Sequence, residues 1–262
     1  MSVFLTPDKK PFYGGTYFPA EERYGIPSFR TLLLSIEDSW ENRREEILNS
    51  AESAKLYLEK LYSRYSKGDK ELSVEILKTA FQDFEKRYDN DYGGFGPAPK
   101  FPMGHSLSFL LRYWKRSGEK KALAMVQATL DKMAGGGLHD QLGGGFHRYS
   151  TDREWFLPHF EKMLYDQALL VSAYCDLYLI TGKAIYKKII FETLDFVLRE
   201  MTDKDGGFYS AYDADGPSIS DFSKKREGAF YVWAKEEILK ILPEKEGEIF
   251  CYFFGIQEDG NI

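Results

Sequence analysis

The sequence is poor in cysteine and in long apolar runs, and each shortage excludes a class of protein. Cys175 and Cys251 are the 2 cysteines among 262 residues, and they form neither a Cys-x-x-Cys pair nor a zinc-type spacing. Free thiols in apolar surroundings predict a reducing, cytoplasmic setting. No apolar run approaches the roughly 18 residues that span a bilayer. The first residues also lack the basic start and long apolar stretch of a secretion signal. We therefore expect no membrane partner.

An excess of positive charge is also missing. The 35 basic and 41 acidic side chains are interspersed and give a net charge of −6. Because a nucleic-acid interface needs a basic face, we expect no nucleic-acid partner. The acidic Asp213-Ala-Asp215 segment does not have the spacing of an EF-hand loop. The sequence therefore predicts neither a metal nor another cofactor.

Aromatic residues, by contrast, make up 16% of the chain, and several gather in one charged stretch between His139 and Asp166. Three of the 4 histidines lie there, together with carboxylates and arginines. Proton-transfer groups among apolar rings are what a small-molecule pocket needs. Aromatic rings also stack on the apolar faces of sugars, which modestly favours a sugar-like ligand.

Two regions are predicted, residues 1–66 and 70–262. In the first, β-type runs at 3–6 and 12–18 predict a hairpin. Apolar spacing then predicts one long helix from Pro27 to about Tyr62. The polar segment from Ser66 to Lys70 is the expected boundary.

The second region alternates helical patterns with a recurring Gly-Gly-Phe element, which ends at Phe95, Phe146 and Phe208. Helices are expected at 72–88, 105–117, 119–134, 158–181, 184–201 and 234–242. Repeated helical hairpins indicate a closed toroid or an open solenoid. The glycines permit tight turns, and each following Phe is expected to pack into the core.

Several motifs resemble the thioredoxin-domain-containing family that includes spermatogenesis-associated protein 20. They are Val3-Phe-Leu-Thr-Pro-Asp8, Pro11-Phe-Tyr-Gly-Gly-Thr-Tyr-Phe-Pro19, Gly93-Gly-Phe-Gly-Pro-Ala-Pro-Lys-Phe-Pro102, the run from Gly135 to Ala168, and Tyr212-Asp-Ala-Asp215. The resemblance implies a mainly α fold, in which the C-terminal remnant of a thioredoxin-like α/β domain precedes a partial (α/α)6 toroid. Toroids of this six-hairpin glycosidase-like type also occur in sugar epimerases and glycoside hydrolases.

The departures from this family predict a fragment. The redox segment that carries its cysteine has no counterpart here, so thiol redox activity is not expected of this chain. The residues after Asp69 suffice for about three hairpins of the toroid. We therefore expect an exposed apolar toroid edge, through which the chain self-associates or pairs with the missing segments.

The expected catalytic residues can transfer protons; they are His139, His147, His159, Asp166 and Asp213. The expected substrate-binding residues offer rings or charges; they are Arg148, Tyr149, Trp155, Lys162 and Tyr212. If residues from 158 onward are helical, His159, Lys162 and Asp166 share one face and line the mouth of the toroid.

Alternatives stay open for these residues. Lys162 and Asp166 could form a plain surface pair, and Asp152 could simply end a loop. A pair formed by His139 and His147 would suit an epimerase-like reaction, whereas Asp213, Asp215 and Glu227 would suit glycoside hydrolysis. The competing hypothesis for the whole chain is a non-catalytic interaction or structural protein.

Overall fold

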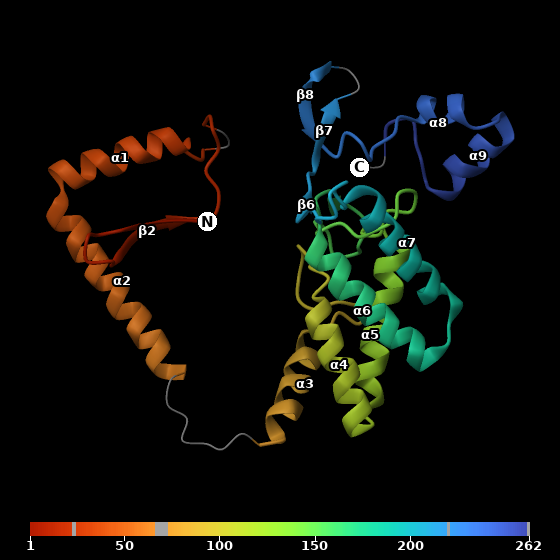
Figure 1. Ribbon diagram of the computed structural model, residues 1–262, viewed down its shortest axis with the longest axis horizontal. Coiled ribbons are helices and arrows are strands. Elements are labelled where there is room, and N and C mark those ends of the chain that lie inside the picture. Colours follow the sequence, from red (N-terminus) through yellow and green to blue (C-terminus); the bar gives the residue numbers. More distant parts are fainter. Residues whose placement is uncertain (23–24, 66–72, 219–220, 261–262) are drawn as a thin grey trace. The chain divides into compact units, whose positions relative to one another are not determined.

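The structure, a computed structural model, describes residues 1–22, 25–65, 73–218 and 221–260 (Figure 1). The chain divides into two compact units, Met1–Ser73 (unit 1) and Val74–Ile262 (unit 2). The predicted boundary from Ser66 to Lys70 lies outside the described residues. Within the described ranges, no helix is both long and apolar enough to cross a membrane.

Unit 1 is a β-hairpin packed against two helices. Strands β1 (Ser2–Leu5) and β2 (Pro11–Gly15) pair antiparallel, and helix α1 (Phe29–Asn42) begins where the Ser28 side chain accepts the N–H of Thr31. Helix α2 (Arg44–Tyr65) packs against β2. Because a hairpin alone is marginal in water, the stacking of Phe12 on Trp40 of α1, with centroids 6.4 Å apart, supplies needed burial.

The prediction of one continuous helix up to Tyr62 is wrong. The backbone of Arg43 leaves the helical region, with φ −134° and ψ 37°, and separates α1 from α2. At the break, the Arg43 guanidinium donates a hydrogen bond to Ser39 Oγ at 2.6 Å. Apolar spacing continues on both sides of the break, since both helices bury a face, and the sequence pattern therefore does not reveal it.

Unit 2 is built of helical hairpins that pack side by side (Figure 1). Helix α3 (Glu75–Arg87) packs on α4 (Gly104–Ser117), which forms a hairpin with α5 (Lys120–Gly135). Helices α6 (Leu164–Thr181) and α7 (Ala184–Glu200) form the next hairpin, and α6 also packs on α4. Gly118 and Gly182 end α4 and α6 with positive φ, which permits the short turns. The predicted mainly α fold, built of helical hairpins, is confirmed.

The core of unit 2 lies between these helices. Its fully buried members include Leu107 and Leu110 of α4, Leu130 of α5, and Leu170 and Tyr174 of α6. Phe146, the second predicted Gly-Gly-Phe residue, is 0% exposed and stacks on Tyr174, whereas Phe208, the third, is 56% exposed. The core position predicted for Phe208 is therefore wrong.

Short strands occupy the loops between the hairpins. They are β3 (Tyr149–Ser150), β4 (Pro158–His159), β5 (Lys162–Met163), β6 (Ala211–Tyr212), β7 (Asp215–Ser218) and β8 (Asp221–Glu227). Strand β3 pairs with β4, β5 with β6, and β7 with β8, all antiparallel. The predicted helix 158–181 begins only at Leu164, because Pro158–His159 pair with β3 and Lys162–Met163 pair with β6.

The chain continues beyond the β7–β8 hairpin into α8 (Lys235–Ile241) and α9 (Glu244–Phe253). Helix α9 was not predicted. Large apolar side chains are exposed on α7 and α9; they include Phe191 (54%), Leu198 (64%), Ile249 (66%), Tyr252 (91%) and Phe253 (77%). Each of these two helices therefore presents apolar side chains to solvent.

Candidate functional site

Two loops of unit 2 have the same internal hydrogen bonding. Asp89 precedes α4 and Asp140 precedes α6, and each exchanges backbone bonds with the two glycines of the following Gly-Gly-Phe element. Each aspartate also accepts two nearby backbone N–H groups at Oδ1, from Asp91 and Tyr92 in the first loop and from Leu142 and Gly143 in the second. The Gly-Gly-Phe repeat of the sequence is therefore a structural repeat.

A buried lysine holds each of these loops. Lys100 Nζ donates to Asp89 Oδ2 at 2.6 Å and to the Gly93 carbonyl at 2.7 Å. Lys162 Nζ does the same with Asp140 Oδ2 at 2.7 Å and the Gly144 carbonyl at 2.8 Å. Both lysines are 1% exposed. Lys162, which was expected to bind substrate, thus forms a buried ion pair with Asp140.

The ion pair also determines the charge state of the Asp140 loop. Burial acts to raise the pKa of Asp140, but the Lys162 ammonium and the N–H groups of Gly143 and Leu142 outweigh it and lower that pKa. Asp140 therefore stays ionised, and its carboxylate accepts every hydrogen bond that it makes.

His139 and His147 lie in the interior. His147 is 2% exposed, its Nδ1 lies 3.0 Å from the Phe160 carbonyl, and burial together with the Lys162 charge lowers its pKa to about 3. His139 is 3% exposed against Phe146, burial lowers its pKa, and neither ring nitrogen has a hydrogen-bond partner among the described residues. Both histidines of the pair considered for proton transfer are therefore buried.

Trp155 is also an interior residue. It is 0% exposed, and its indole N–H donates to the Tyr92 carbonyl at 2.9 Å. A Cβ at Gly94 would lie 2.6 Å from its ring, so the indole packs directly on that loop. The ring predicted to stack on a ligand instead fixes the Gly-Gly-Phe loop before α4.

The accessible residues form a second group, which we name the His159 cluster: Arg148, Tyr149, His159, Glu161, Asp166 and Glu227. Strand pairing places Tyr149 opposite His159, and their rings stack with centroids 4.9 Å apart. The ring of Phe101 also contacts Tyr149, with centroids 4.9 Å apart. His159 Nδ1 is 2.5 Å from Glu227 Oε1, and 24% of the His159 side chain is exposed. The cluster thus presents aromatic surface beside a paired imidazole.

Charged groups complete the cluster. Arg148 Nη1 lies 2.5 Å from Glu161 Oε2, and the Arg148 N–H donates to the Glu161 carbonyl at 2.8 Å. Burial raises the pKa of Asp166 to about 7, although the Arg148 charge opposes the shift and Glu161 adds to it. Asp166 Oδ2 has no hydrogen-bond partner among the described residues. Asp166 can therefore exchange a proton near neutral pH.

The remaining predicted residues lie on the β6–β7 segment. Tyr212 pairs with Lys162 in the β5–β6 ladder, and its ring meets Phe196 at 6.2 Å. Asp213 is exposed, accepts the N–H of Asp215 at 3.2 Å and lies 3.9 Å from Lys225 Nζ. The bond from the Asp215 N–H to the Asp213 side chain is that of an Asx-turn. Within the described ranges, no group of three His, Cys, Asp or Glu side chains is placed to hold a metal.

The sequence pattern did not predict two contacts of the cluster. These are the pairing of Arg148 with Glu161 and that of His159 with Glu227. Glu227 is 68 residues from His159, and no local spacing could have shown the contact. Glu161 lies two residues after His159, and only the extended backbone there brings it to Arg148.

Asp166 should make the stability of unit 2 depend on pH. Its pKa is higher in the folded chain, about 7, than the ordinary 3.8, so the folded state binds more protons within this window. The stability due to Asp166 is therefore present below about pH 4 and is lost as pH rises towards 7. Asparagine does not titrate, so the Asp166→Asn variant does not lose this stability. The free energy of unfolding of the variant minus that of the natural chain should therefore increase as pH rises across this window. Urea unfolding at several pH values measures this difference.

The natural chain has to be compared with Asp166→Asn because His147 changes the pH dependence of stability in the opposite direction. Its pKa is lowered from 6.5 to about 3, so the unfolded chain binds more protons in that range and stability rises with pH. The difference between the two chains cancels this contribution. A difference that stays constant from pH 4 to 7 would contradict the prediction.

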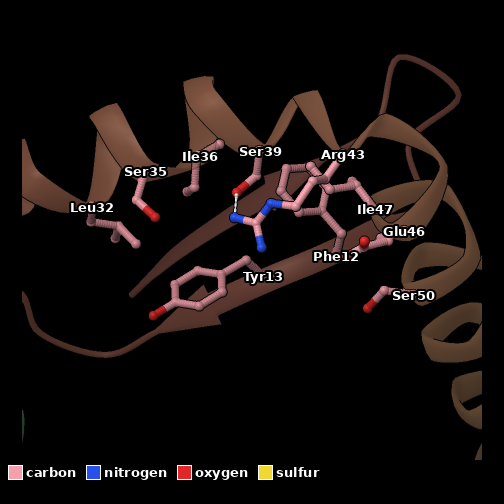
Figure 2. A pocket seen from close by; sticks show the side chains of 10 residues that line it. All are labelled: Phe12, Tyr13, Leu32, Ser35, Ile36, Ser39, Arg43, Glu46, Ile47 and Ser50. Carbon is pink, nitrogen blue, oxygen red and sulfur yellow. Dashed lines mark hydrogen bonds between the residues drawn. The ribbon is translucent and has the colours of Figure 1, made fainter. Parts of the chain in front are cut away.

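Unit 1 contains a cavity of about 300 Å³ between β2 and the two helices (Figure 2). Figure 2 shows the Arg43 guanidinium over it, bonded to Ser39 and near Tyr13. Its lining is serine hydroxyls, apolar side chains, Arg43 and Glu46, without a histidine. The cavity therefore lacks the imidazole that characterises the His159 cluster.

Fold and cluster together define a helical-hairpin protein with an aromatic, titratable surface on its loops. The chain is 40% identical to human spermatogenesis-associated protein 20 over its full length, and it spans 35% of that protein. It is 39% identical to the uncharacterized protein B0495.5 of Caenorhabditis elegans, of which it spans 37%. The chain belongs to the family of spermatogenesis-associated protein 20. It spans about a third of the length of these curated relatives.

Two further likenesses concern parts of the chain. Residues 1–59 match the family model Thioredox_DsbH, described as a protein of unknown function, DUF255. A crystal structure of a sugar epimerase from a ruminal bacterium is similar over 53% of this chain and 40% of that one, with 18% identity and a TM-score of 0.46.

Proposed function

We propose that the His159 cluster binds a small sugar-like molecule and transfers protons on it, as an epimerase does. The observation that supports this most directly is the His159 imidazole, which is bonded to Glu227 and stacked on the half-buried Tyr149. An aromatic face suits the apolar face of a sugar ring, and a neutral imidazole beside a carboxylate is a proton acceptor. We propose the same activity for any longer protein that contains this chain.

The proposed reaction is balanced without a cofactor. His159 removes the proton from the carbon next to the sugar carbonyl. The C–H electron pair then forms a C=C bond while the carbonyl π pair moves onto oxygen, which gives an enediolate. Reprotonation of that carbon on the opposite face gives the epimer, with no net oxidation or reduction. Asp166, whose pKa is raised to about 7, is the candidate donor because both of its protonation states are populated near neutral pH. Arg148 would orient the sugar hydroxyls.

The hydrolytic alternative is less well supported by the contacts of its carboxylates. Hydrolysis would assign the acid and base to Asp213, Asp215 and Glu227. Glu227 is bonded to His159, while Asp213 is exposed and engaged with Lys225 and its own turn. Proton transfer by the imidazole therefore accounts for more of the observed contacts.

Thiol redox chemistry is not proposed for this chain. Cys175 lies on α6, where burial raises the pKa of its thiol, and Cys251 is buried on α9. A redox cysteine needs the opposite, an accessible thiol with a lowered pKa.

A panel of monosaccharides tests the proposal by isothermal titration calorimetry. We expect saturable binding of at least one sugar, and we expect His159→Ala to weaken it about tenfold or more, through the loss of one stacked and bonded ring. His105→Ala is the matched control, because His105 is an exposed histidine on α4 that is not a member of the cluster. Proton transfer would appear as deuterium incorporation into the bound sugar from heavy water.

The second candidate is a non-catalytic interaction protein, as the sequence analysis already allowed. It is favoured by the exposed apolar side chains of α7 and α9, among them Tyr252 and Phe253. This surface would support self-association or pairing with other segments. The same calorimetric panel separates the candidates: binding that is equal in His159→Ala and in the natural chain, or no sugar binding, would favour the second.

A further inference from the structure

The β7–β8 hairpin is anchored directly beside the segment that carries His159. At its end, Gly228 has φ +73°, and a Cβ there would lie 2.6 Å from the ring of Phe160. Tyr231 stacks on the same Phe160 ring, with centroids 5.3 Å apart and planes 9° from parallel. Because Glu227 immediately precedes Gly228, these contacts fix the backbone of Glu227 next to His159.

The bond between Glu227 and His159 also defines which imidazole nitrogen is protonated. An ionised carboxylate only accepts hydrogen bonds, so His159 Nδ1 must be the donor at 2.5 Å. In a neutral imidazole the other nitrogen, Nε2, then carries the lone pair. The carboxylate nearest to Nε2 is that of Glu161, at 3.9 Å from Oε2, which is beyond hydrogen-bond distance. Nε2 is thus the nitrogen that could accept a proton from a ligand.

The ring plane of His159 is fixed independently of Glu227. Its stacking on Tyr149, 4.9 Å away and 21° from parallel, sets the plane of the imidazole. Stacking does not distinguish the two ring nitrogens, because a face contact is the same for either tautomer. A hydrogen bond at one nitrogen is needed to select the tautomer, and Glu227 supplies it.

We propose that Glu227, from the β7–β8 hairpin, is the positioning residue that holds His159 as the Nδ1–H tautomer and leaves Nε2 as the base of the site. This inference rests on the proposed function for the catalytic consequence, but the tautomer itself does not depend on any ligand. Glu227 acts through His159, and the proton of the substrate goes to Nε2.

Long-range proton–nitrogen NMR on the full chain tests the tautomer without any sugar. In the natural chain, His159 should show a protonated Nδ1 and an unprotonated Nε2. Glu227→Ala should convert it to the Nε2–H form, which free histidine prefers. Glu227→Gln keeps an oxygen that accepts from Nδ1–H, so it should retain the natural tautomer. Glu248→Gln, at an exposed position of α9, is the control for the loss of a charge.

A second measurement connects the tautomer with the proposed reaction. Deuterium incorporation into the bound sugar should fall about 100-fold in Glu227→Ala, the order expected for loss of a general base, while the sugar Kd changes little. Glu227→Gln should recover part of the rate, and circular dichroism should show all variants folded.

The outcomes separate the two proposals. An unchanged His159 tautomer in Glu227→Ala overturns the positioning role, whatever the sugar data show. A tautomer change accompanied by an equal loss of sugar binding and rate overturns it as well, because Glu227 would then be a binding residue. A tautomer change in a chain that binds no sugar supports the role of Glu227 on His159 and contradicts the proposed function.

Discussion

Replacing Lys162 with methionine should lower the free energy of unfolding by about 3–5 kcal/mol, the loss typical when one partner of a buried ion pair is removed. The side chain of Lys162 is 1% exposed and that of Asp140 12%, so water cannot replace the missing ammonium easily. The substitution keeps most of the volume but leaves Asp140 Oδ2 and the Gly144 carbonyl without this donor. Urea unfolding followed by circular dichroism measures the effect.

The matched control is Lys188→Met on α7. Lys188 is 67% exposed and pairs with Glu192 at 3.5 Å one helical turn away, a contact worth about 0.5 kcal/mol or less. If both methionine variants lose equally little stability, the Lys162 contact is not a structural clamp. Replacing Asp140 with asparagine as well should restore part of the loss, because no buried charge is then unpaired and Oδ1 still accepts the N–H groups of Leu142 and Gly143.

Gly144→Ala should destabilise unit 2 by about 3 kcal/mol or more, through two effects that add at one position. The first is φ of +77°, in a region where a Cβ costs about 1–2 kcal/mol. The second is a steric conflict, since the new Cβ would lie 2.5 Å from the backbone oxygen of Glu192 on α7. A backbone atom of a packed helix cannot move away as a flexible side chain can.

Gly182→Ala separates the two effects. Gly182 ends α6 with φ +69°, but a Cβ there meets nothing within 4 Å. This variant should therefore lose only the conformational part, about 1–2 kcal/mol. Thermal unfolding of both variants makes the comparison. A similar loss in the two would show that α7 does not pack as closely on the Asp140 loop as the structure has it.

The helices of the two hairpins were predictable from the sequence almost to their ends. Residues 105–117 and 184–201 were predicted, and the helices span Gly104–Ser117 and Ala184–Glu200. Their signals are local, since apolar spacing and the capping glycines Gly118 and Gly182 act within a few residues. The start of α6 was misplaced because the strands before it depend on Tyr149 and Tyr212, which are distant in sequence.

The candidate site was predictable as a region but not as a set of side chains. The stretch from His139 to Asp166 contains most of the His159 cluster, as its mixture of rings and charges indicated. Folding divides it, however: His147, Trp155 and Lys162 point into the interior, while Tyr149 and His159 are partly exposed. Composition alone does not distinguish these groups, because both contain aromatic and titratable residues.

Local patterns were thus sufficient for α3, α4, α5 and α7 and for the glycine turns of the repeated loops, since periodicity, capping and positive φ involve neighbouring residues. Tertiary packing decided which charged and aromatic residues are buried and which are accessible. Lys162 is buried because Asp140 and Gly144 surround its ammonium, and His159 is paired because a hairpin from much later in the chain delivers Glu227. A side chain acquires its environment only when segments far apart in sequence meet, so its chemistry follows from the fold.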